Sequence, residues 1–416
     1  MQIGVIGSGI AGIGAAWYLS SRHRVDLFEK EPHYGGHAHT VDVQEEKQTC
    51  PIDIGFQVFN HATYPLLTRF FSELSLEIVD SNMSFSVYNP AEDFVYNSRG
   101  RGFFFQKRRV LSLDHWRFLF EIIRWSQNGL KMLRENSIPE GMTFAELLQP
   151  YSKEFQEHYA IPMVASIWSA PPRETQAFPA RTFLEFFRNH GLLNLRDRPA
   201  WKTVRGCSRE YVQRALQHIS GRHFSNSPVE KVIRSKKSVE VYYREEGSSR
   251  LHRAEYDHVV IATHPPETLQ ILAAPTKEEK NILSNFKYQK NRVTLHTQSD
   301  LLHPSKRSWA SWNYIISAPN GASRVNINYW TNLLQESPLT KDYFVTLNRL
   351  PSLRPKNIIY ETTMSHPGYD TPSIQAQSEI ETINGKQRVW FAGAWQRYGF
   401  HEDGLWSAKR IAESMP

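Results

Sequence analysis

Hydrophobic positions at the start of the chain follow first a strand pattern, then a helix pattern, then a strand pattern again. Residues 3–6 predict a buried strand, residues 11–19 a helix, and residues 24–29 a second strand. Later apolar runs at 256–263 and 388–394 have the length and composition of buried parallel strands. This succession predicts an α/β fold built around a parallel sheet.

The turn between the first strand and the helix is rich in glycine. Gly7 permits a tight turn, Gly9 lets the backbone approach a pyrophosphate, and Gly12 lets the helix pack closely on the strand. The second strand ends in Glu29, about 20 residues on, where a ribose diol needs a carboxylate acceptor. We therefore expect a dinucleotide site here, which Ile10, Ala11 and Lys30 also border.

Long apolar and aromatic side chains are most frequent in residues 64–199 and 265–377, which contain no phosphate-binding turn. Residues 113–133 have the apolar spacing of an amphipathic helix, and we expect ordinary core packing for it. Residues 99–109 place three phenylalanines between basic clusters. They fit either an interface with anionic lipid or a buried strand with solvated ends.

Composition narrows the class of protein. With 416 residues, 40% of them hydrophobic and 12% aromatic, the chain exceeds what one core usually supports, so we expect two domains. Two distant cysteines and no metal-ligand spacing predict neither a disulfide framework nor a metal site. The net charge of +7 comes with no nucleic-acid motif. The first predicted strand begins at Gln2 and leaves no room for a cleavable leader, so we expect a cytoplasmic protein. No run of about 20 apolar residues is present, so we expect any membrane association to be peripheral.

Two further segments carry a resemblance to a known family. The paired glycines Gly35 and Gly36 precede His37, and Asp53, Gly55 and Phe56 follow in an Asp-x-Gly segment. With the early glycine turn, these resemble the flavin-containing amine oxidase superfamily, in which a Gly-Gly-Arg turn and an Asp-x-Gly segment lie against the flavin. His37 stands in place of the arginine.

The resemblance extends to the end of the chain and to its centre. Residues 388–394 followed by 399–408 are similar to the closing flavin motif of the superfamily, and residues 228–243 to its adenosine-side hairpin. The resemblance implies cofactor contacts from these segments: Val229, Val232, Ala262, Gly393, Ala394, His401, Glu402, Asp403, Gly404 and Leu405. In the Gly-Gly turn that relatives carry before the hairpin, Cys207 takes the second place, and we expect a small buried residue with ordinary dihedrals.

The resemblance implies FAD as the cofactor and a Rossmann-like FAD-binding domain of the glutathione-reductase type with an interleaved α+β substrate-binding domain. Residues 1–63, 200–264 and 378–416 would form the FAD-binding domain, and residues 64–199 and 265–377 the substrate domain that caps the flavin.

Catalytic positions depend on which side chains face the flavin. Amine oxidases of the superfamily use a lysine there, but strand alternation over residues 289–297 predicts that Asn291 faces inward and Lys290 outward. His296 on the same strand could transfer a proton or be structurally bonded. Tyr398 and Phe400 stand where the superfamily's cage aromatics lie.

These features favour an FAD-dependent oxidoreductase that takes a hydride from a C–H bond of an apolar substrate, such as a lipid acyl chain or polyene, as a desaturase or double-bond isomerase. The bacterial subgroup that the chain most resembles, that of predicted NAD/FAD-binding proteins, names a cofactor and no substrate. A flavin-dependent amine oxidase and a flavoprotein with only a binding or structural role remain the alternatives.

Overall fold

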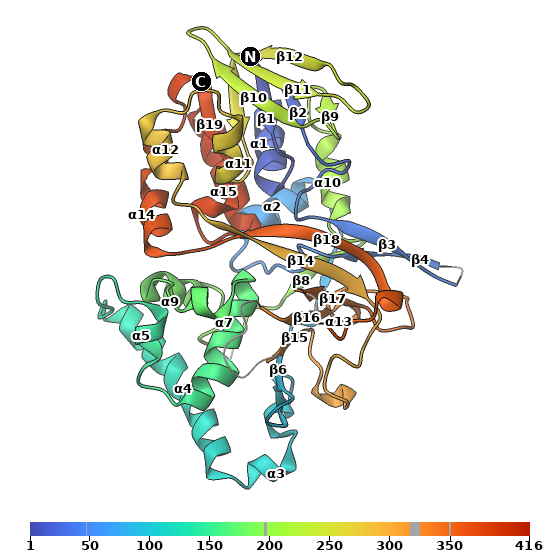
Figure 1. Ribbon diagram of the computed structural model, residues 1–416, viewed down its shortest axis with the longest axis vertical. Helices are drawn as coiled ribbons and strands as arrows, with labels where there is room; N and C mark the ends of the chain where they lie inside the picture. Colours follow the sequence, from blue (N-terminus) through green and yellow to red (C-terminus); the bar gives the residue numbers. More distant parts are fainter. Residues whose placement is uncertain (47, 195–197, 317–324, 349–350) are drawn as a thin grey trace.

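Strands from three distant parts of the chain form one parallel sheet. In the computed structural model, which describes residues 1–46, 48–194, 198–316, 325–348 and 351–416, this sheet lies at one end of an elongated molecule (Figure 1). Its order is β19 (Val389–Phe391), β13 (His258–Ile261), β1 (Gln2–Ile6), β2 (Arg24–Phe28) and β9 (His223–Phe224). All four pairings are parallel. The two ends and the centre of the chain therefore meet, although the predicted domain boundaries remain a prediction.

Burial explains why β1 is the central strand. Ile3 and Val5 are fully buried, as expected for a strand with neighbours on both edges and covered faces. Helices α1 (Ile10–Ser20) and α15 (His401–Ser414) pack along each other beside this sheet (Figure 1). Their approach depends on Gly14, because a Cβ there would lie 2.6 Å from Cδ2 of Leu405.

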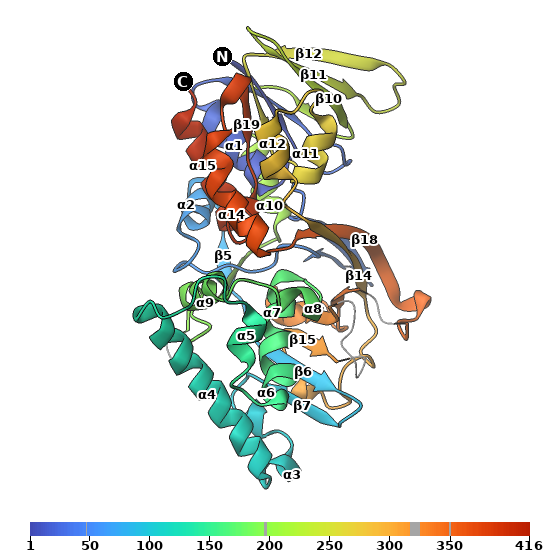
Figure 2. The ribbon, with the colours of Figure 1, turned by 60° about the vertical axis from the view of Figure 1, so that its left-hand side comes forward.

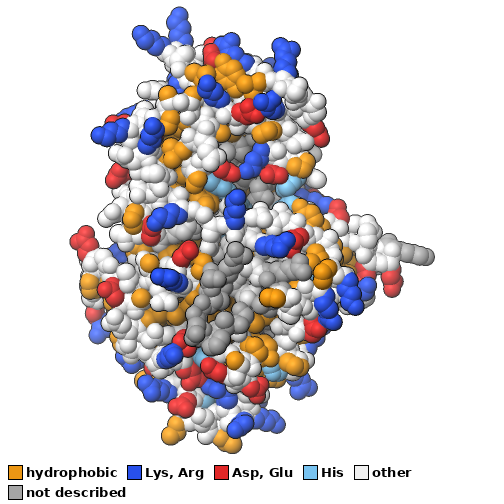
Figure 3. Space-filling view, viewed as in Figure 1, with side chains coloured by type: hydrophobic (Ala, Val, Ile, Leu, Met, Phe, Trp, Pro, Cys, Tyr) orange, Lys and Arg blue, Asp and Glu red, His pale blue; other side chains and the backbone are white. Residues whose placement is uncertain are grey.

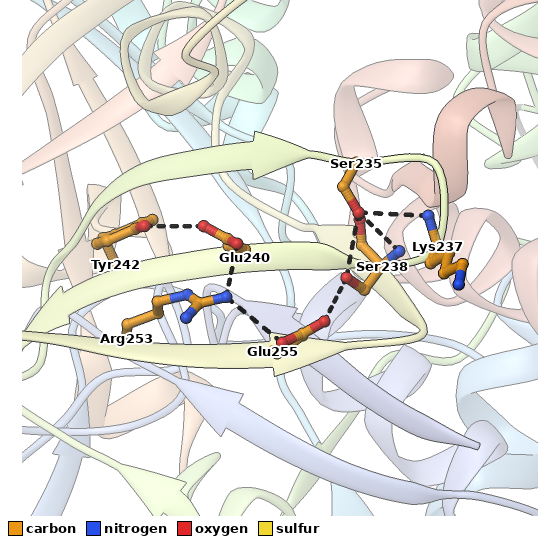
Figure 4. Close-up of polar contacts among 7 residues, drawn as sticks. All are labelled: Ser235, Lys237, Ser238, Glu240, Tyr242, Arg253 and Glu255. Atoms are coloured by element: carbon orange, nitrogen blue, oxygen red, sulfur yellow. Dashed lines mark hydrogen bonds and ion pairs between the residues drawn. The ribbon is translucent and has the colours of Figure 1, made fainter.

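A small antiparallel sheet covers the same end of the molecule. It consists of β10 (Val229–Arg234), β11 (Val239–Arg244) and β12 (Leu251–Tyr256). Polar side chains link its strands, as Figure 4 shows: Glu240 accepts hydrogen bonds from Tyr242 at 2.7 Å and from Arg253 at 2.6 Å. The β10–β11 turn is closed by Ser235, whose hydroxyl accepts from the backbone N–H of Ser238 at 3.0 Å.

A second large sheet has seven strands and forms the other half of the molecule. Its order is β18 (Ile358–Pro367), β14 (Tyr288–His296), β17 (Phe344–Leu347), β16 (Ile327–Trp330), β15 (Trp312–Ile315), β6 (Phe85–Asn89) and β7 (Phe94–Asn97). The long antiparallel pair β14 and β18 crosses between the two halves (Figure 1). Side chains on this pair can therefore face the parallel sheet.

Two pairs of short strands and a set of helices complete the fold. The pairs are β3 (Thr40–Glu45) with β4 (Gln48–Asp53), and β5 (Ile78–Asp80) with β8 (Lys202–Val204). The helices are α2 (Pro65–Glu73), α3 (Lys107–Val110), α4 (Leu113–Arg134), α5 (Phe144–Leu148), α6 (Lys153–Phe155), α7 (Ile161–Trp168), α8 (Pro172–Thr175), α9 (Ala180–Asn189), α10 (Arg209–Leu216), α11 (Pro265–Ile271), α12 (Lys277–Leu283), α13 (Thr331–Leu334) and α14 (Thr371–Glu379).

The largest hydrophobic core lies between the seven-stranded sheet and the helices α4, α5, α7 and α9. Phe118 of α4, Val164 of α7 and Phe183 of α9 are buried in it together with Tyr329 of β16. The helix predicted at 113–133 is thus present as α4, and it lies along the outside of this half of the molecule (Figure 2).

Cys207 corrects one expectation. Its φ is +74°, in the left-handed region that favours glycine, whereas the sequence predicted ordinary dihedrals. Cys207 therefore adopts a backbone conformation that glycine accepts more readily, at a steric cost of about 1–2 kcal/mol.

Neither a membrane-spanning helix nor a metal-binding group occurs among the described residues. No helix in the described ranges has both the length and the apolar character needed to cross a bilayer. Among the same residues, no group of three or more His, Cys, Asp or Glu side chains is arranged to hold a metal ion.

Candidate functional site

The glycine turn between β1 and α1 is built as the motif predicts. A Cβ on Gly12 would lie 1.8 Å from the carbonyl oxygen of Gly7, and a Cβ on Gly7 would lie 2.9 Å from that of Ala262. Both glycines are therefore needed for strand and helix to approach. Gly9 differs, because a Cβ there would meet no atom within 4 Å. The space beside Gly9 is open at the helix N-terminus, where backbone N–H groups attract anions.

The acidic residue at the end of β2 lies against this turn. Glu29 is buried, and its carboxylate accepts hydrogen bonds from the backbone N–H of Ser8 at 2.9 Å and from its hydroxyl at 2.6 Å. Its other oxygen accepts from the N–H of Glu31 at 2.9 Å. The neighbouring Lys30 instead forms an ion pair with Glu267 at 2.6 Å. Glu29 is therefore held in the place where a ribose acceptor is expected.

The second glycine pair folds onto the first turn. A Cβ on Gly36 would lie 3.0 Å from Cα of Gly9, and Gly35 donates its N–H to the carbonyl of Ser8 at 3.1 Å. The Asp-x-Gly segment packs there too, since a Cβ on Gly55 would lie 2.0 Å from the carbonyl oxygen of His37. Phe56 donates its N–H to that same carbonyl at 2.8 Å. Three glycine segments separated in sequence are thus stacked on one another.

Three histidines gather beside this stack. The ring centroid of His37 lies 5.2 Å from that of His366 on β18 and 6.2 Å from that of His264, which follows β13. Burial lowers the pKa of all three, to about 4 for His264 and about 3 for His366, with neighbouring imidazoles adding to the effect for the latter two. The imidazoles are therefore neutral at physiological pH. Nε2 of His37 is buried without a hydrogen-bond partner among the described residues.

The closing segment of the chain also reaches the glycine turn. A Cβ on Gly404 would lie 2.6 Å from Cγ2 of Ile10 and 3.3 Å from the backbone nitrogen of Ala11. Gly393 donates its N–H to the hydroxyl of Ser407 at 3.0 Å, and the carbonyl of Ala394 accepts from Gly399 at 3.1 Å. The start of α15 is therefore pressed against the start of α1.

The polar side chains of this closing segment are engaged by the protein, and their contact with a cofactor stays a prediction. Glu402 accepts the N–H groups of Leu66 and Leu67 at 3.0 and 2.9 Å, at the start of α2. Asp403 accepts the N–H of Phe400 at 2.9 Å, and burial raises its pKa to about 7. With these partners, the backbone of the turn is the part left to contact a ligand.

His401 and Asp53 are likewise bound within the protein. The ring of His401 stacks on that of Phe56, with centroids 3.8 Å apart, and its Nε2 lies 3.1 Å from the hydroxyl of Tyr211. The carboxylate of Asp53 accepts from the hydroxyl of Ser208 at 2.6 Å and from its N–H at 2.8 Å, just before α10, and burial raises its pKa to about 6. Both side chains thus join separate segments around the glycine stack.

The two hairpin valines predicted to contact the cofactor differ in burial. Val232 is buried in a hydrophobic core beneath β10, whereas Val229 is partly exposed at the start of the strand. The N–H of Ala262 donates to the carbonyl of Ile6 at 2.8 Å, which extends the pairing of β13 with β1. Their contact with a nucleotide remains a prediction.

On β14, Asn291 is buried and Lys290 is exposed, which is the orientation predicted from alternation. The Asn291 amide donates to the carbonyl of Ser169 at 2.9 Å, and its Nδ2 lies 2.9 Å from Nδ1 of His366. Its oxygen accepts from Nδ2 of Asn348 at 2.7 Å. Asn291 therefore belongs to the histidine cluster, while its catalytic role stays a prediction.

His296 lies outside this cluster, which argues against its predicted proton-transfer role. It ends β14 on the far side, fully buried, with Nε2 2.6 Å from the hydroxyl oxygen of Thr346 and Nδ1 accepting from the N–H of Gln298 at 3.1 Å. Burial lowers its pKa to about 4. Both nitrogens are engaged, which favours a structural role for His296, and its proton-transfer role stays a prediction.

An aromatic pocket lies next to Asn291. Trp168 precedes the Ser169 carbonyl that Asn291 binds, and its indole N–H donates to the carbonyl of Tyr398 at 3.2 Å. Phe400 stacks on Phe186 of α9, with centroids 4.9 Å apart. The residues that line the pocket are Trp168, Phe178, Pro179, Thr182, Phe183, Tyr369 and Tyr398. Tyr398 thus forms part of the wall, whereas Phe400 packs on Phe186 outside the lining.

Comparison with known proteins agrees with this geometry. Residues 5–74 match the NAD(P)-binding Rossmann-like domain family. A provisionally assigned protoporphyrinogen oxidase from Exiguobacterium sp. 255-15 superposes with a TM-score of 0.70 at 15% identity, covering 100% of this chain and 98% of the other. A CLA-producing fatty acid isomerase from P. acnes gives 0.69 at 13% identity, with coverage of 100% and 98%. The chain therefore shares its fold with these solved structures.

Two other comparisons are with an amine oxidase of known structure and with curated protein sequences. A cyclohexylamine oxidase from Brevibacterium oxydans IH-35A has the same fold, with a TM-score of 0.66 at 16% identity over 100% of this chain and 99% of that one. Curated protein sequences gave no significant match. These structural matches confirm the predicted fold class. Because the sequence identities are this low, the matches show a shared fold and no more.

Sequence reasoning missed three residues of the site. Ser8 lies inside the glycine motif and His264 directly after a predicted strand, so their positions were visible but not their contacts. His366 had no local signal, because the pairing of β18 with β14 alone brings it to His37.

Proposed function

We propose that this protein is an FAD-dependent oxidoreductase. The fit rests on three observations at the glycine turn: open space beside Gly9, an α1 N-terminus without a side-chain cap, and a buried Nε2 of His37 that lacks a partner. Backbone N–H groups at Gly9 and after it would hold the pyrophosphate, and Glu29 the ribose. His37, with no charge of its own, would present its free Nε2 to the cofactor.

A bound flavin would supply hydride acceptance next to Asn291 and the aromatic pocket. The chain's own residues would position the substrate and exclude water. Tyr398 and the rings around it form a wall with few polar groups, and burial raises the pKa of Tyr398, so its hydroxyl stays protonated. Asn291 holds the Ser169 carbonyl and His366 in place and brings no charge to the site.

We propose that the substrate is an apolar chain, such as a lipid acyl group or a polyene, which undergoes desaturation or double-bond isomerisation. The observations that support this proposal are the aromatic lining of the pocket at Tyr398 and a buried amide, not a lysine, at position 291. A desaturase would need a further electron acceptor, whereas an isomerase would return the hydride to its product.

Amine oxidation is the second candidate. It is favoured by the shared fold with cyclohexylamine oxidase and by a site of neutral imidazoles, which suits an uncharged amine. A binding or structural role without turnover is the third alternative.

The test begins with the cofactor and then compares substrates. Purified protein should be yellow, and the nucleotide released on denaturation should be FAD. Anaerobic mixing with unsaturated fatty acyl lipids should bleach the flavin or yield a rearranged product detected by mass spectrometry. Rapid bleaching by amines with every lipid unchanged would replace the preferred substrate class, and a colourless protein that carries NAD would overturn the cofactor.

A matched pair of variants connects activity to the pocket. Tyr398→Ala opens the pocket wall and should lower kcat/KM for an apolar substrate at least about tenfold, because a ring contributes 1–3 kcal/mol of apolar contact. Tyr242→Ala removes a tyrosine from the remote three-stranded sheet and should leave kcat/KM unchanged (Figure 4). Equal losses in both variants would contradict a substrate pocket at Tyr398.

A further inference from the structure

One end of the molecule carries an apolar surface that nothing in the described chain covers. Of the nine large hydrophobic side chains exposed in the described residues, six lie between positions 104 and 123. Leu111 and Leu113 are 90% and 87% exposed, and Phe120 is 63% exposed. Together with Phe104, Trp116 and Ile123 they form what we call the α4 apolar face. Isolated exposed apolar residues are ordinary, but a contiguous group marks an interaction surface.

The helix α4 is apolar on two opposite sides. Leu113, Trp116, Phe120 and Ile123 fall within an arc of about 80° at 3.6 residues per turn. Phe118, Ile122 and Trp125 are buried and lie on the opposite side, in the core shared with α9. Core packing therefore explains only the inner side of the helix, and the outer side needs another explanation.

The aromatic residues of the α4 apolar face can move from water into an apolar medium without losing hydrogen bonds. The ring centroids of Phe104 and Trp116 lie 6.0 Å apart, so the turn before α3 and the first turns of α4 form one surface. The indole N–H of Trp116 donates to the carbonyl of Val110 at 2.9 Å. Burial of this indole in an apolar medium thus leaves no donor unpaired.

The structure revises the expectation for the three consecutive phenylalanines. Only Phe104 is exposed, while Phe103 stacks on Tyr96 with centroids 4.8 Å apart. Phe105 is partly buried near His303, with centroids 5.6 Å apart. Residues 99–109 therefore supply mainly cations, and α4 supplies most of the apolar area.

Cations surround the face. Arg101, Lys107 and Arg108 are exposed, and none forms an ion pair with a described residue. Arg117 is also exposed and lies 3.9 Å from Glu121. Exposed acids also occur nearby: Asp114 lies in the first turn of α4, where it favours the helix, and Asp93 accepts a hydrogen bond from Gln106 through its carbonyl. The lower end of the molecule in Figure 3 shows hydrophobic and basic side chains next to each other.

We propose that the α4 apolar face docks the protein on the surface of an anionic lipid bilayer. Apolar rings would enter the headgroup boundary while Arg101, Lys107 and Arg108 approach the lipid phosphates. A second copy of this chain fits less well, because it would bring a second set of unpaired cations to the same interface. The proposal does not depend on the reaction that the protein catalyses.

The α4 apolar face is connected through the fold to the aromatic pocket. Helix α4 packs on α9, where Gly129 allows the side chains of Leu184 and Leu193 to approach. Thr182 and Phe183 of α9 line the aromatic pocket. Docking would therefore fix to the lipid surface the helix on which the pocket-lining α9 packs.

The experiment is co-sedimentation of the full chain with vesicles. We expect binding to vesicles that contain phosphatidylglycerol and little binding to pure phosphatidylcholine, with affinity that falls as salt rises. Trp116→Ser with Phe120→Ser, and separately Lys107→Glu with Arg108→Glu, should each reduce the partition coefficient at least about tenfold. All four side chains are surface groups, so circular dichroism and Tm should be unchanged.

The matched control reverses two lysines at the other end of the molecule. Lys236 and Lys237 are exposed in the β10–β11 turn, where Figure 4 shows only the backbone nitrogen of Lys237 in a contact. Lys236→Glu with Lys237→Glu changes the net charge equally and should keep vesicle binding. Loss of binding in this control, retained binding in either α4-face variant, or absence of binding by the wild type would overturn the proposal. Self-association that depends on Trp116 and Phe120 without vesicle binding would assign the face to a second copy.

Discussion

At the scale of single residues, Gly9 and Gly12 lack a side chain for different reasons. Gly12 leaves room for protein atoms, because the Gly7 carbonyl fills the space its Cβ would need. Gly9 leaves room that no protein atom fills. The two positions can therefore separate folding from cofactor retention.

The first prediction uses this difference. Gly12→Ala places a Cβ 1.8 Å from a carbonyl oxygen and should lower the free energy of unfolding by more than about 3 kcal/mol. Gly9→Val keeps an extended backbone with φ −62° and ψ 175°, so it should lose the flavin and fold with nearly the Tm of flavin-free wild type. Thermal melts and visible absorbance measure the two effects. Full flavin retention in Gly9→Val would refute the role of this space.

The second prediction concerns Asn291. Removal of its amide in Asn291→Ala leaves the Ser169 carbonyl and the Asn348 amide without these partners, and should lower the free energy of unfolding by about 1–3 kcal/mol. The exposed neighbour provides the control, because Lys290→Ala should change stability by less than about 0.5 kcal/mol. Urea unfolding measures both, and a larger loss in Lys290→Ala would contradict the observed orientation of β14.

At the scale of elements, the start of α15 organises several segments at once. Its first turn contacts the start of α1 through Gly404, and its Glu402 side chain caps the start of α2. A carboxylate at a helix N-terminus satisfies free N–H groups and opposes the positive end of the helix dipole. The resemblance assigned Glu402 to the cofactor, whereas the structure uses it to join helices.

The third prediction follows from this cap. Glu402→Ala removes the acceptor of two N–H groups and should lower the free energy of unfolding by about 1–2 kcal/mol. Glu413 lies on the same helix, exposed and 3.6 Å from Lys409, so Glu413→Ala should cost less than about 0.5 kcal/mol. Chemical denaturation compares the two variants. Equal stability of Glu402→Ala and wild type would show that the cap contributes nothing.

At the scale of the whole molecule, buried titratable groups determine how stability depends on pH. Burial lowers the pKa of six histidines to about 3 or 4, namely His39, His190, His264, His296, His366 and His401. It raises the pKa of Asp53 to about 6 and of Asp403 to about 7. The two sets act in opposite directions.

The fourth prediction is a loss of stability in mild acid. An unfolded histidine takes up a proton near pH 6.5 and the folded one only near 3 or 4, so each contribution is complete above 6.5 and is lost as pH falls toward 4. The two aspartates gain stability over the same fall, but six histidines outweigh them. Tm measured from about pH 7 to about pH 5 should therefore decrease.

A variant at Asp403 tests the predicted direction in which pH changes Tm. Asp403→Asn removes a group that ionises at a cost in the folded protein, so its Tm relative to wild type should rise as pH increases from about 4 to about 7 and level off above that. A difference in Tm that does not vary with pH would show that Asp403 does not titrate as a buried acid.

The sequence by itself determined the local chemistry of this protein. Glycine spacing, strand alternation and the acid after the second strand depend on near neighbours, so they predicted the turn at Gly9, the inward Asn291 and the place of Glu29. Only the tertiary structure decided which distant groups meet: His366 with His37, Glu402 with α2, and Asp53 with α10. It also decided that His296 lies away from the site and that α4 keeps an uncovered apolar side. Such contacts depend on strand pairing and packing across hundreds of residues, and no local pattern encodes them.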